Sequence, residues 1–168
     1  HTDDTDLMTL TSGTLTVAGT VAATTLTGDG SGITGLATSV NGLSDALIET
    51  NSMYIGNDPS STTSTAEYNL AVGTTALDAV TTGDKNTAMG YNALTANTTG
   101  SYNVAFGTYS LKANTTGDQN TAYGVQSLYN NTTGSYNTAS GFGSLYNNTT
   151  GSYNTASGQK SLYSNTTG

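Results

Sequence analysis

A block of seventeen residues that repeats without gaps is the feature that most restricts how this chain can fold. The block Ser135–Gly151 ("SYNTASGFGSLYNNTTG") is followed at once by Ser152–Gly168 ("SYNTASGQKSLYSNTTG"), and the two differ at three of seventeen places. Four earlier units, with more drift, begin at Glu67, Asp84, Ser101 and Asp118. Six units therefore fill residues 67–168. Repetition at a fixed period predicts a solenoid, in which each unit contacts its neighbours, rather than an ordinary globule.

The residues before the six units divide into three segments. Residues 50–66 keep the period and its glycine, Gly56, but lack the asparagine and the leucine, so we interpret them as a degenerate capping coil. Within residues 1–37, Leu7–Leu26 alternate apolar residues with Thr around short turns, which predicts a narrow β-rich shaft or assembly segment over residues 1–37. Within residues 38–49, the apolar residues Val40, Leu43 and Leu47 have helical spacing, so a short helix or a linker is expected there.

The composition excludes several classes of protein. Among 168 residues there are two Phe, no Trp and 34% hydrophobic residues, too few for a conventional core. Without cysteine the chain has neither disulfides nor thiolate metal sites. A formal charge of −8 with only three lysines argues against a nucleic-acid partner. No apolar run approaches the roughly 20 residues of a membrane helix, so no membrane insertion is expected.

Each unit carries strand and turn signals at fixed positions. Positions 3 to 7 read N-T-A-x-G, and positions 10 to 17 read [SA]-L-x-x-N-T-T-G. Short Thr-rich runs bounded by Gly and Asn predict two short strands per coil. Turns are expected at position 7 and at T-T-G, where glycine allows positive φ. The turn glycines of position 7 are Gly73, Gly90, Gly107, Gly124, Gly141 and Gly158.

Stacked coils about 4.8 Å apart place every side chain over its counterpart in the next coil. The period therefore predicts ladders, with stacked asparagine amides bonded along the axis. The asparagine ladder of position 3 is Asn69, Asn86, Asn103, Asn120, Asn137 and Asn154. The inward leucines of position 11 are Leu77, Leu94, Leu111, Leu128, Leu145 and Leu162. An alanine ladder at position 5 is expected to point inward beside them.

A single solenoid of this thickness is expected to be marginally stable. A buried Leu contributes about 1.5–3 kcal/mol, whereas ordering the backbone costs about 1–2 kcal/mol for each residue. We therefore expect several copies of the chain to associate laterally and so stabilise the solenoid. The six units are nearly neutral, with four acids against three lysines, so stacking and association meet little repulsion. The candidate oligomer seam, at position 6, is Val72, Met89, Phe106 and Tyr123, followed by Ser140 and Ser157.

The N-T-A-x-G-x-x-[SA]-L units resemble the N-x-A-x-G head repeats of trimeric autotransporter adhesins. The resemblance implies parallel β-rolls packed three together, although the repeat of this chain is longer. The segment Leu15–Ala37 ("LTVAGTVAATTLTGDGSGITGLA") is similar to segments of phage tail fibres. Together the two resemblances imply a homotrimeric β-solenoid on an extracellular, cell-surface or virion fibre.

Several motifs could indicate a cofactor, catalytic or metal site, but each also has a plainer interpretation. The run Gly30–Gly35 ("GSGITG") matches G-x-G-x-x-G, but no convincing helix follows it, so a flexible turn is favoured over a dinucleotide site. His1 is the only histidine, which excludes histidine triads and multi-histidine metal sites. Four turn aspartates could supply oxygen ligands to calcium, but their spacing fits no known loop, and solvated side chains are favoured. These are Asp29, Asp58, Asp84 and Asp118. No cofactor is expected.

Two further patterns leave alternatives open. The tyrosines of position 12, Tyr129, Tyr146 and Tyr163, are candidate glycan contacts, although stacking between coils is the plainer explanation and is favoured. Position 2 carries a second tyrosine stripe that includes Tyr136 and Tyr153. The N-T-T sequons at Asn97, Asn114, Asn131, Asn148 and Asn165, and the N-N-T sequons at Asn130 and Asn147, are potential glycan acceptors, although the turn already explains their recurrence.

The sequence therefore predicts a non-enzymatic structural protein, the shaft or head of an extracellular adhesin or virion tail fibre. Its expected partners are other copies of the chain and a surface glycan or receptor. The alternatives are a subunit of an extracellular helical filament that stacks end to end and, from another class, a carbohydrate-processing β-helix enzyme, for which no clustered acid pair is found. The last two units are almost identical and carry no cap, so that edge is expected to meet further coils or another subunit.

Overall fold

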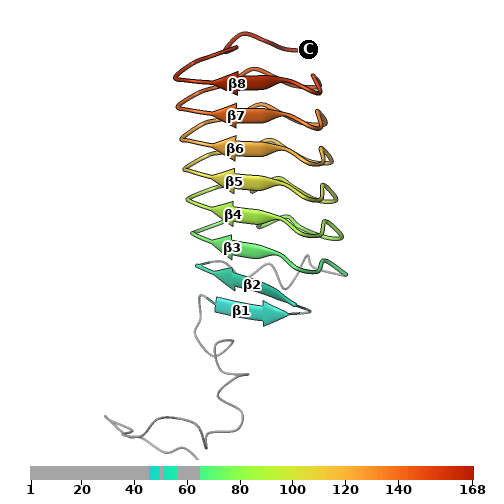
Figure 1. Cartoon of the computed structure of the whole chain (residues 1–168). Coiled ribbons are helices and arrows are strands. Elements are labelled where there is room, and N and C mark those ends of the chain that lie inside the picture. Colours follow the sequence, from blue (N-terminus) through green and yellow to red (C-terminus); the bar gives the residue numbers. More distant parts are fainter. Residues whose placement is uncertain (1–45, 50, 57–64) are drawn as a thin grey trace, which may run out of the picture. The chain divides into compact units, whose positions relative to one another are not determined.

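A computed structural model describes residues 46–49, 51–56 and 65–168 of the chain. These residues form one eight-stranded sheet in the order β1 to β8 (Figure 1). Strands β2 to β8 are parallel, and strand partners from β2 onward lie seventeen residues apart. The predicted all-β parallel solenoid of seventeen-residue coils is confirmed, and the described residues contain no helix.

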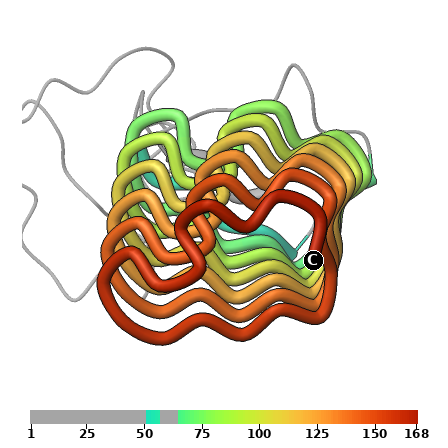
Figure 2. The backbone as a smooth tube through the Cα atoms, turned by 90° about the horizontal axis from the view of Figure 1, so that it is seen from above, coloured from blue at the N-terminus to red at the C-terminus, as the bar shows by residue number. Residues whose placement is uncertain are grey.

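One short strand recurs in each of the six units, with an alanine at its centre. These strands are β3 (Leu70–Val72), β4 (Thr87–Met89), β5 (Val104–Phe106), β6 (Thr121–Tyr123), β7 (Thr138–Ser140) and β8 (Thr155–Ser157). In register, Ala88 lies between Ala71 and Ala105, and all three are buried. Seen along the solenoid axis, successive coils trace the same outline, so each position forms a column (Figure 2).

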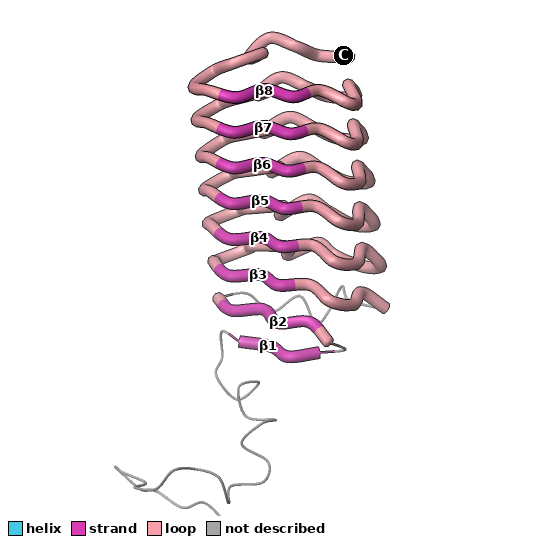
Figure 3. The backbone as a smooth tube through the Cα atoms, in the orientation of Figure 1, coloured by secondary structure: helices cyan, strands magenta, loops and turns pink. Residues whose placement is uncertain are grey.

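The prediction of two strands per coil is wrong, because the second half of each coil is a series of turns (Figure 3). The leucine of position 11 has φ between 48° and 53° in every unit, a left-handed conformation that an extended strand does not allow. Backbone pairing nevertheless continues there from coil to coil. The amide of Leu111 donates to the carbonyl of Ser127 at 3.0 Å, and Ala113 donates to Tyr129 at 3.1 Å.

Burial of the leucines offsets the strain of their backbone. A residue held in a sparsely populated backbone region costs about 1–3 kcal/mol, and a fully buried Leu side chain contributes a similar amount. The leucines of the first five units are fully buried, together with the alanines of position 5. Leu162, in the last unit, is 49% exposed because no coil lies over it in the structure. The predicted inward ladders of Ala and Leu are thus confirmed for the units that have a neighbour on both sides.

The two glycine positions serve different purposes. The position 7 glycines have φ between 114° and 136°, as predicted for the turn there. The T-T-G glycines that lie between two coils do not have positive φ, so that part of the prediction is wrong. They are required because the coils approach closely: a Cβ on Gly117 would lie 2.3 Å from the carbonyl oxygen of Gly134.

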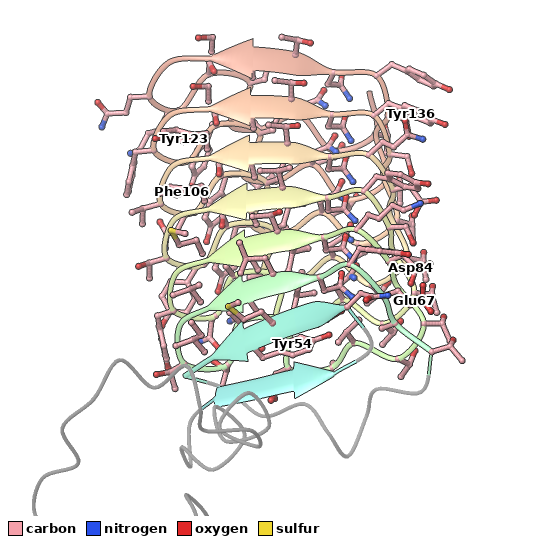
Figure 4. All side chains as sticks on the ribbon, turned by 60° about the horizontal axis from the view of Figure 1, so that its bottom comes forward. Tyr54, Glu67, Asp84, Phe106, Tyr123 and Tyr136 are labelled. Carbon is pink, nitrogen blue, oxygen red and sulfur yellow. The ribbon has the colours of Figure 1, made fainter. Side chains whose placement is uncertain are left out.

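The N-terminal edge of the solenoid is a hairpin. Strand β1 (Ala46–Glu49) pairs antiparallel with β2 (Ser52–Ile55), so the helix expected over residues 38–49 is wrong for these four residues. Strand β2 continues the period, because Tyr54 faces Ala71. Tyr54 replaces the small alanine of the later units and is completely buried at the base of the solenoid (Figure 4).

The hairpin supports the interpretation of residues 50–66 as a capping coil. The outer edge of β2 is already paired with β1, and a large side chain closes the core below β3. The predicted shaft over residues 1–37 lies outside the described residues, as do residues 38–45 of the expected helix or linker.

Replacing Gly124 with Val should strongly destabilise the solenoid. Gly124 has φ +132°, and a Cβ there would lie 2.8 Å from the carbonyl carbon and oxygen of Gly141. Backbone strain alone is worth about 1–3 kcal/mol, and the clash with backbone atoms adds to it. We expect the melting temperature, measured by circular dichroism, to fall by several degrees or more.

The matched control is Gly143→Asn. Gly143 has φ +61°, close to the 56° that Asn92 adopts at the same position of the second unit, and a Cβ there meets only side-chain atoms at 3.5 Å or beyond. This variant should keep the wild-type melting temperature. Equal melting temperatures for Gly124→Val and wild type would contradict the assigned turn.

Candidate functional site

The asparagines of position 3 form the predicted ladder of hydrogen bonds along the solenoid axis. The backbone N–H of Asn120 donates to Oδ1 of Asn103 at 3.0 Å, and its Nδ2 donates to the same oxygen at 3.2 Å. Nδ2 also donates to the carbonyl of Gly134, in the turn that ends the coil, at 2.8 Å. The backbone bond to the preceding asparagine recurs at Asn86, Asn103, Asn137 and Asn154. In the first five units the amide also ties its own coil closed through the turn glycine.

The capping coil takes part in this ladder with a different residue. The backbone N–H of Asn69 donates to the hydroxyl oxygen of Ser52 at 2.9 Å, where the later units supply an asparagine Oδ1. Ser52 is the first residue of β2 and is buried. A short hydroxyl is enough here because it supplies the acceptor that Asn69 needs, and the described residues include no lower coil for it to bond.

A second asparagine ladder, at position 14, was not predicted from the sequence. Nδ2 of Asn114 donates to Oδ1 of Asn97 at 2.8 Å and to the carbonyl of Gly117 at 3.0 Å. The same two bonds recur at Asn131 and Asn148. The seventeen-residue spacing of these asparagines was the signal that could have revealed the ladder.

The second ladder changes the interpretation of the sequons. Asn97, Asn114, Asn131 and Asn148 are completely buried, and their amide nitrogens are engaged in hydrogen bonds. A glycan on any of these nitrogens would displace the bonds to the turn. In the folded solenoid these asparagines are therefore structural residues and not accessible glycan acceptors.

The acidic residues and serines of position 1 form a third ladder. The backbone N–H of Ser101 donates to a carboxylate oxygen of Asp118 at 2.7 Å, and that of Asp118 donates to the hydroxyl of Ser135 at 3.0 Å. Glu67 likewise donates its backbone N–H to Asp84 at 2.8 Å. The structure thus gives Asp84 and Asp118 a bonded role rather than that of solvated turn residues.

The acidic residues do not gather into a metal site in the part of the chain that the structure describes. No group of three or more potential His, Cys, Asp or Glu ligands occurs there. One serine, Ser101, separates Asp84 from Asp118 along the ladder, which keeps these two like charges apart. Asp29 and Asp58, the other two calcium candidates, and the GSGITG run lie outside the described residues.

The three tyrosines of position 12 stack face to face. The ring centroids of Tyr129 and Tyr146 lie 4.9 Å apart with 5° between the planes, and those of Tyr146 and Tyr163 lie 4.9 Å apart with 10°. A sugar binds an aromatic residue by lying on the face of its ring, and the faces between these rings are already occupied. The geometry therefore favours coil-to-coil stacking over the glycan contact considered for these residues.

Lysines join the tyrosine columns. Nζ of Lys112 donates to the hydroxyl of Tyr129 at 3.0 Å and lies 5.3 Å from the centre of the Tyr109 ring. Lys85 donates to the hydroxyl of Tyr102 at 3.0 Å in the column of position 2. These hydrogen bonds raise the pKa of Lys112 and of Lys85. Burial, with a smaller effect of the adjacent tyrosines, raises the pKa of the Tyr146 phenol.

The side chains of the candidate seam project outward from the parallel sheet. Val72 and Met89 are half-buried, whereas Phe106 is 40% exposed and Tyr123 is 58% exposed. The rings of Phe106 and Tyr123 stack at 5.0 Å, on the opposite edge of the strand column from Tyr136 and Asp84 (Figure 4). The structure therefore brings the four predicted seam residues into one outward column.

The described residues enclose no pocket. They also include no helix long and apolar enough to cross a membrane. The features available for recognition in this part of the chain are therefore the columns on its outer surface.

Comparison of the chain with protein-family models, curated proteins and solved structures found no match.

Replacing Asn120 with Ala should weaken the solenoid at two coil contacts. The buried backbone N–H of Asn137 would lose its acceptor, and the carbonyl of Gly134 would keep only the hydrogen bond from Nδ2 of Asn131. A buried polar group left without a partner costs about 1–3 kcal/mol. We expect a fall in melting temperature of several degrees.

Asn147→Ala is the control for this substitution. Asn147 is a half-buried residue of position 13, where the first three units carry Ala79, Ala96 and Ala113. It accepts one side-chain hydrogen bond, from Asn130 at 3.0 Å, so its loss should cost about 1 kcal/mol or less. Equal destabilisation by the two substitutions would show that the buried ladder has no special role.

Proposed function

We propose that this chain is a non-enzymatic structural fibre protein that forms the shaft or head of an extracellular adhesin or a virion tail fibre. The observation that carries the proposal is the outward face of the parallel sheet, which presents one uncharged column at each of positions 4 and 6. Such a face suits lateral packing of identical copies. The coils themselves supply a rod that grows by about 4.8 Å for each seventeen residues.

The face is apolar in its lower part and polar in its upper part. Met53, Ile55, Val104, Phe106 and Tyr123 are large apolar or aromatic residues that are at least 40% exposed on strands β2 to β6. Strands β7 and β8 present Thr and Ser at the corresponding positions, and no rung of the sheet from β2 to β8 has a charged residue there. A contiguous apolar patch without charges is typical of an interaction surface.

Identical copies fit this face because of its regular spacing. A rotation about an axis parallel to the solenoid brings each rung of one copy level with the same rung of the next. Phe106 then meets Phe106, and each strand of the apolar lower part adds a similar layer of contact. Cyclic symmetry of this kind closes without leaving an open edge. The number three comes from the resemblance to the head repeats of trimeric autotransporter adhesins.

The hairpin at the N-terminal edge favours lateral over end-to-end association. Strand β1 occupies the edge of β2 with antiparallel pairing, so a coil from another subunit cannot add there in the parallel register that the solenoid uses. This observation supports the laterally associated fibre over the helical filament that stacks end to end.

An extracellular or virion location agrees with the kinds of interaction that stabilise the solenoid. Its stability rests on hydrogen-bonded amides, small buried side chains and stacked rings, which require neither disulfides nor bound metal. A surface glycan or receptor remains the proposed partner of the fibre. Because the faces between the position 12 tyrosines are covered, we do not assign the contact to them.

Replacing Phe106 with Asp should dissociate the oligomer without unfolding the chain. The substitution removes the stack with Tyr123, but Phe106 is 40% exposed on a single solenoid, so the new carboxylate reaches solvent there. A charge buried between copies is, by contrast, strongly unfavourable. Light scattering of the full-length protein should give about three times the 17.0 kDa chain mass for wild type and the mass of one chain for the variant.

Ser157→Asp is the matched control, since Ser157 occupies the same column in the polar upper part of the face. It should leave the wild-type mass unchanged. Circular dichroism must show the same secondary structure for both variants. A monomeric wild type, or a Phe106→Asp variant that keeps the wild-type mass, would refute position 6 as the seam.

A further inference from the structure

The tyrosines on the side of the solenoid form an unbroken series of ring contacts. Tyr91 meets Tyr109 edge to face at 5.3 Å, and Tyr109 meets Tyr129 edge to face at 6.1 Å. From Tyr129 the contacts continue as the face-to-face stack through Tyr146 to Tyr163. The series therefore joins the second unit to the sixth.

The stacked part of this series differs from an ordinary aromatic cluster. Tyr129, Tyr146 and Tyr163 are each half-buried, so their edges reach solvent while their faces cover one another. Their planes are within 10° of parallel, and equivalent atoms of successive rings are superposed because the residues are seventeen apart. Phenol rings that are held in this way and remain accessible to small oxidants are well placed for radical coupling.

We propose that Tyr129, Tyr146 and Tyr163 are a site of oxidative modification, at which dityrosine bonds form between successive coils of one chain. The co-substrate is hydrogen peroxide, and the agent is a one-electron oxidant of the haem peroxidase class. The bonds lie within a single chain, so this inference does not depend on the oligomeric state proposed above.

The reaction balances with peroxide as the electron acceptor. Each of two phenols loses one electron and its hydroxyl proton, and the two phenoxyl radicals couple through the ring carbons adjacent to the hydroxyl groups. The hydrogen atoms on those carbons then move to the oxygens and restore both phenols. The peroxide takes up the two hydrogen atoms that the tyrosines lost and is reduced to two water molecules.

The surrounding charges favour the pair Tyr146 and Tyr163. The Lys112 ammonium donates a hydrogen bond to the Tyr129 hydroxyl at 3.0 Å and lies 5.0 Å from its ring, which opposes removal of an electron from Tyr129. Lys160 lies farther from the Tyr163 ring, at 5.7 Å. Contacts along the series allow a radical formed on Tyr129 to pass to Tyr146.

A second pair with the same geometry lies in the column of position 2. Tyr136 and Tyr153 stack at 4.8 Å with 2° between their planes, and both are exposed. They join the fifth and sixth units, as Tyr146 and Tyr163 do. Phe106 and Tyr123 stack in the same way, but phenylalanine forms no phenoxyl radical, so this pair is an internal negative control.

The experiment treats the folded full-length chain with horseradish peroxidase and hydrogen peroxide. We expect dityrosine fluorescence, a chain mass lowered by two hydrogen atoms for each bond, and cross-linked peptides that join Tyr146 to Tyr163 and Tyr136 to Tyr153. Tyr146→Phe keeps the stacked ring but removes the central phenol, so it should abolish every bond in the position 12 column. The bond between Tyr136 and Tyr153 should persist in this variant.

Tyr91→Phe is the control, because it removes a phenol outside the stack, and it should leave the yield of both bonds unchanged. A circular dichroism spectrum identical to that of wild type verifies that the Phe variants are folded. Three results would overturn the proposal: no dityrosine in wild type, bonds that join different chains, or an undiminished position 12 signal in Tyr146→Phe.

Discussion

The structure depends on the hydrogen bonds that join each coil to the coil seventeen residues away. The side-chain amide of a central position 3 asparagine such as Asn120 accepts from the coil above and donates to the coil below and to its own closing turn. A buried amide left without partners is costly, so any shift of one coil against the next would lose many bonds at once. This requirement holds the coils in register and creates the columns on the outer surface.

The same register explains why so few large side chains are needed. The interior is filled by alanine, leucine and asparagine, and glycines allow adjacent backbones to approach closely at the turns. Leucine adopts a left-handed backbone conformation in every unit because the turn directs its side chain inward. On the outside, identical spacing turns isolated aromatic residues into stacked columns, so that one structural rule generates the proposed oligomer face and the proposed oxidation site.

Much of the candidate site could be predicted from the repeat, and the errors have identifiable causes. Asn120, Leu128 and Gly124 lie where the period placed them. The ladder at Asn114 was overlooked because the N-T-T pattern also matches a glycan acceptor, and burial alone distinguishes the two. The prediction of a second strand in each coil was wrong because the backbone of Leu111 is in the left-handed conformation, which a leucine in the sequence does not indicate. Leu47 pairs with Tyr54 in a hairpin, since pairing with a neighbouring strand outweighed the helical spacing of Val40, Leu43 and Leu47.

The sequence by itself determined the solenoid, its period and the identity of the stacked residues, because a fixed repeat superposes equivalent positions however each coil bends. Only the tertiary structure decided the path of the coil between those positions. That path depends on which backbone conformations allow the chain to close after seventeen residues while its buried amides stay bonded. It determines that Asn131 points inward, that Phe106 points outward, and that the faces of Tyr129 and Tyr146 cover each other.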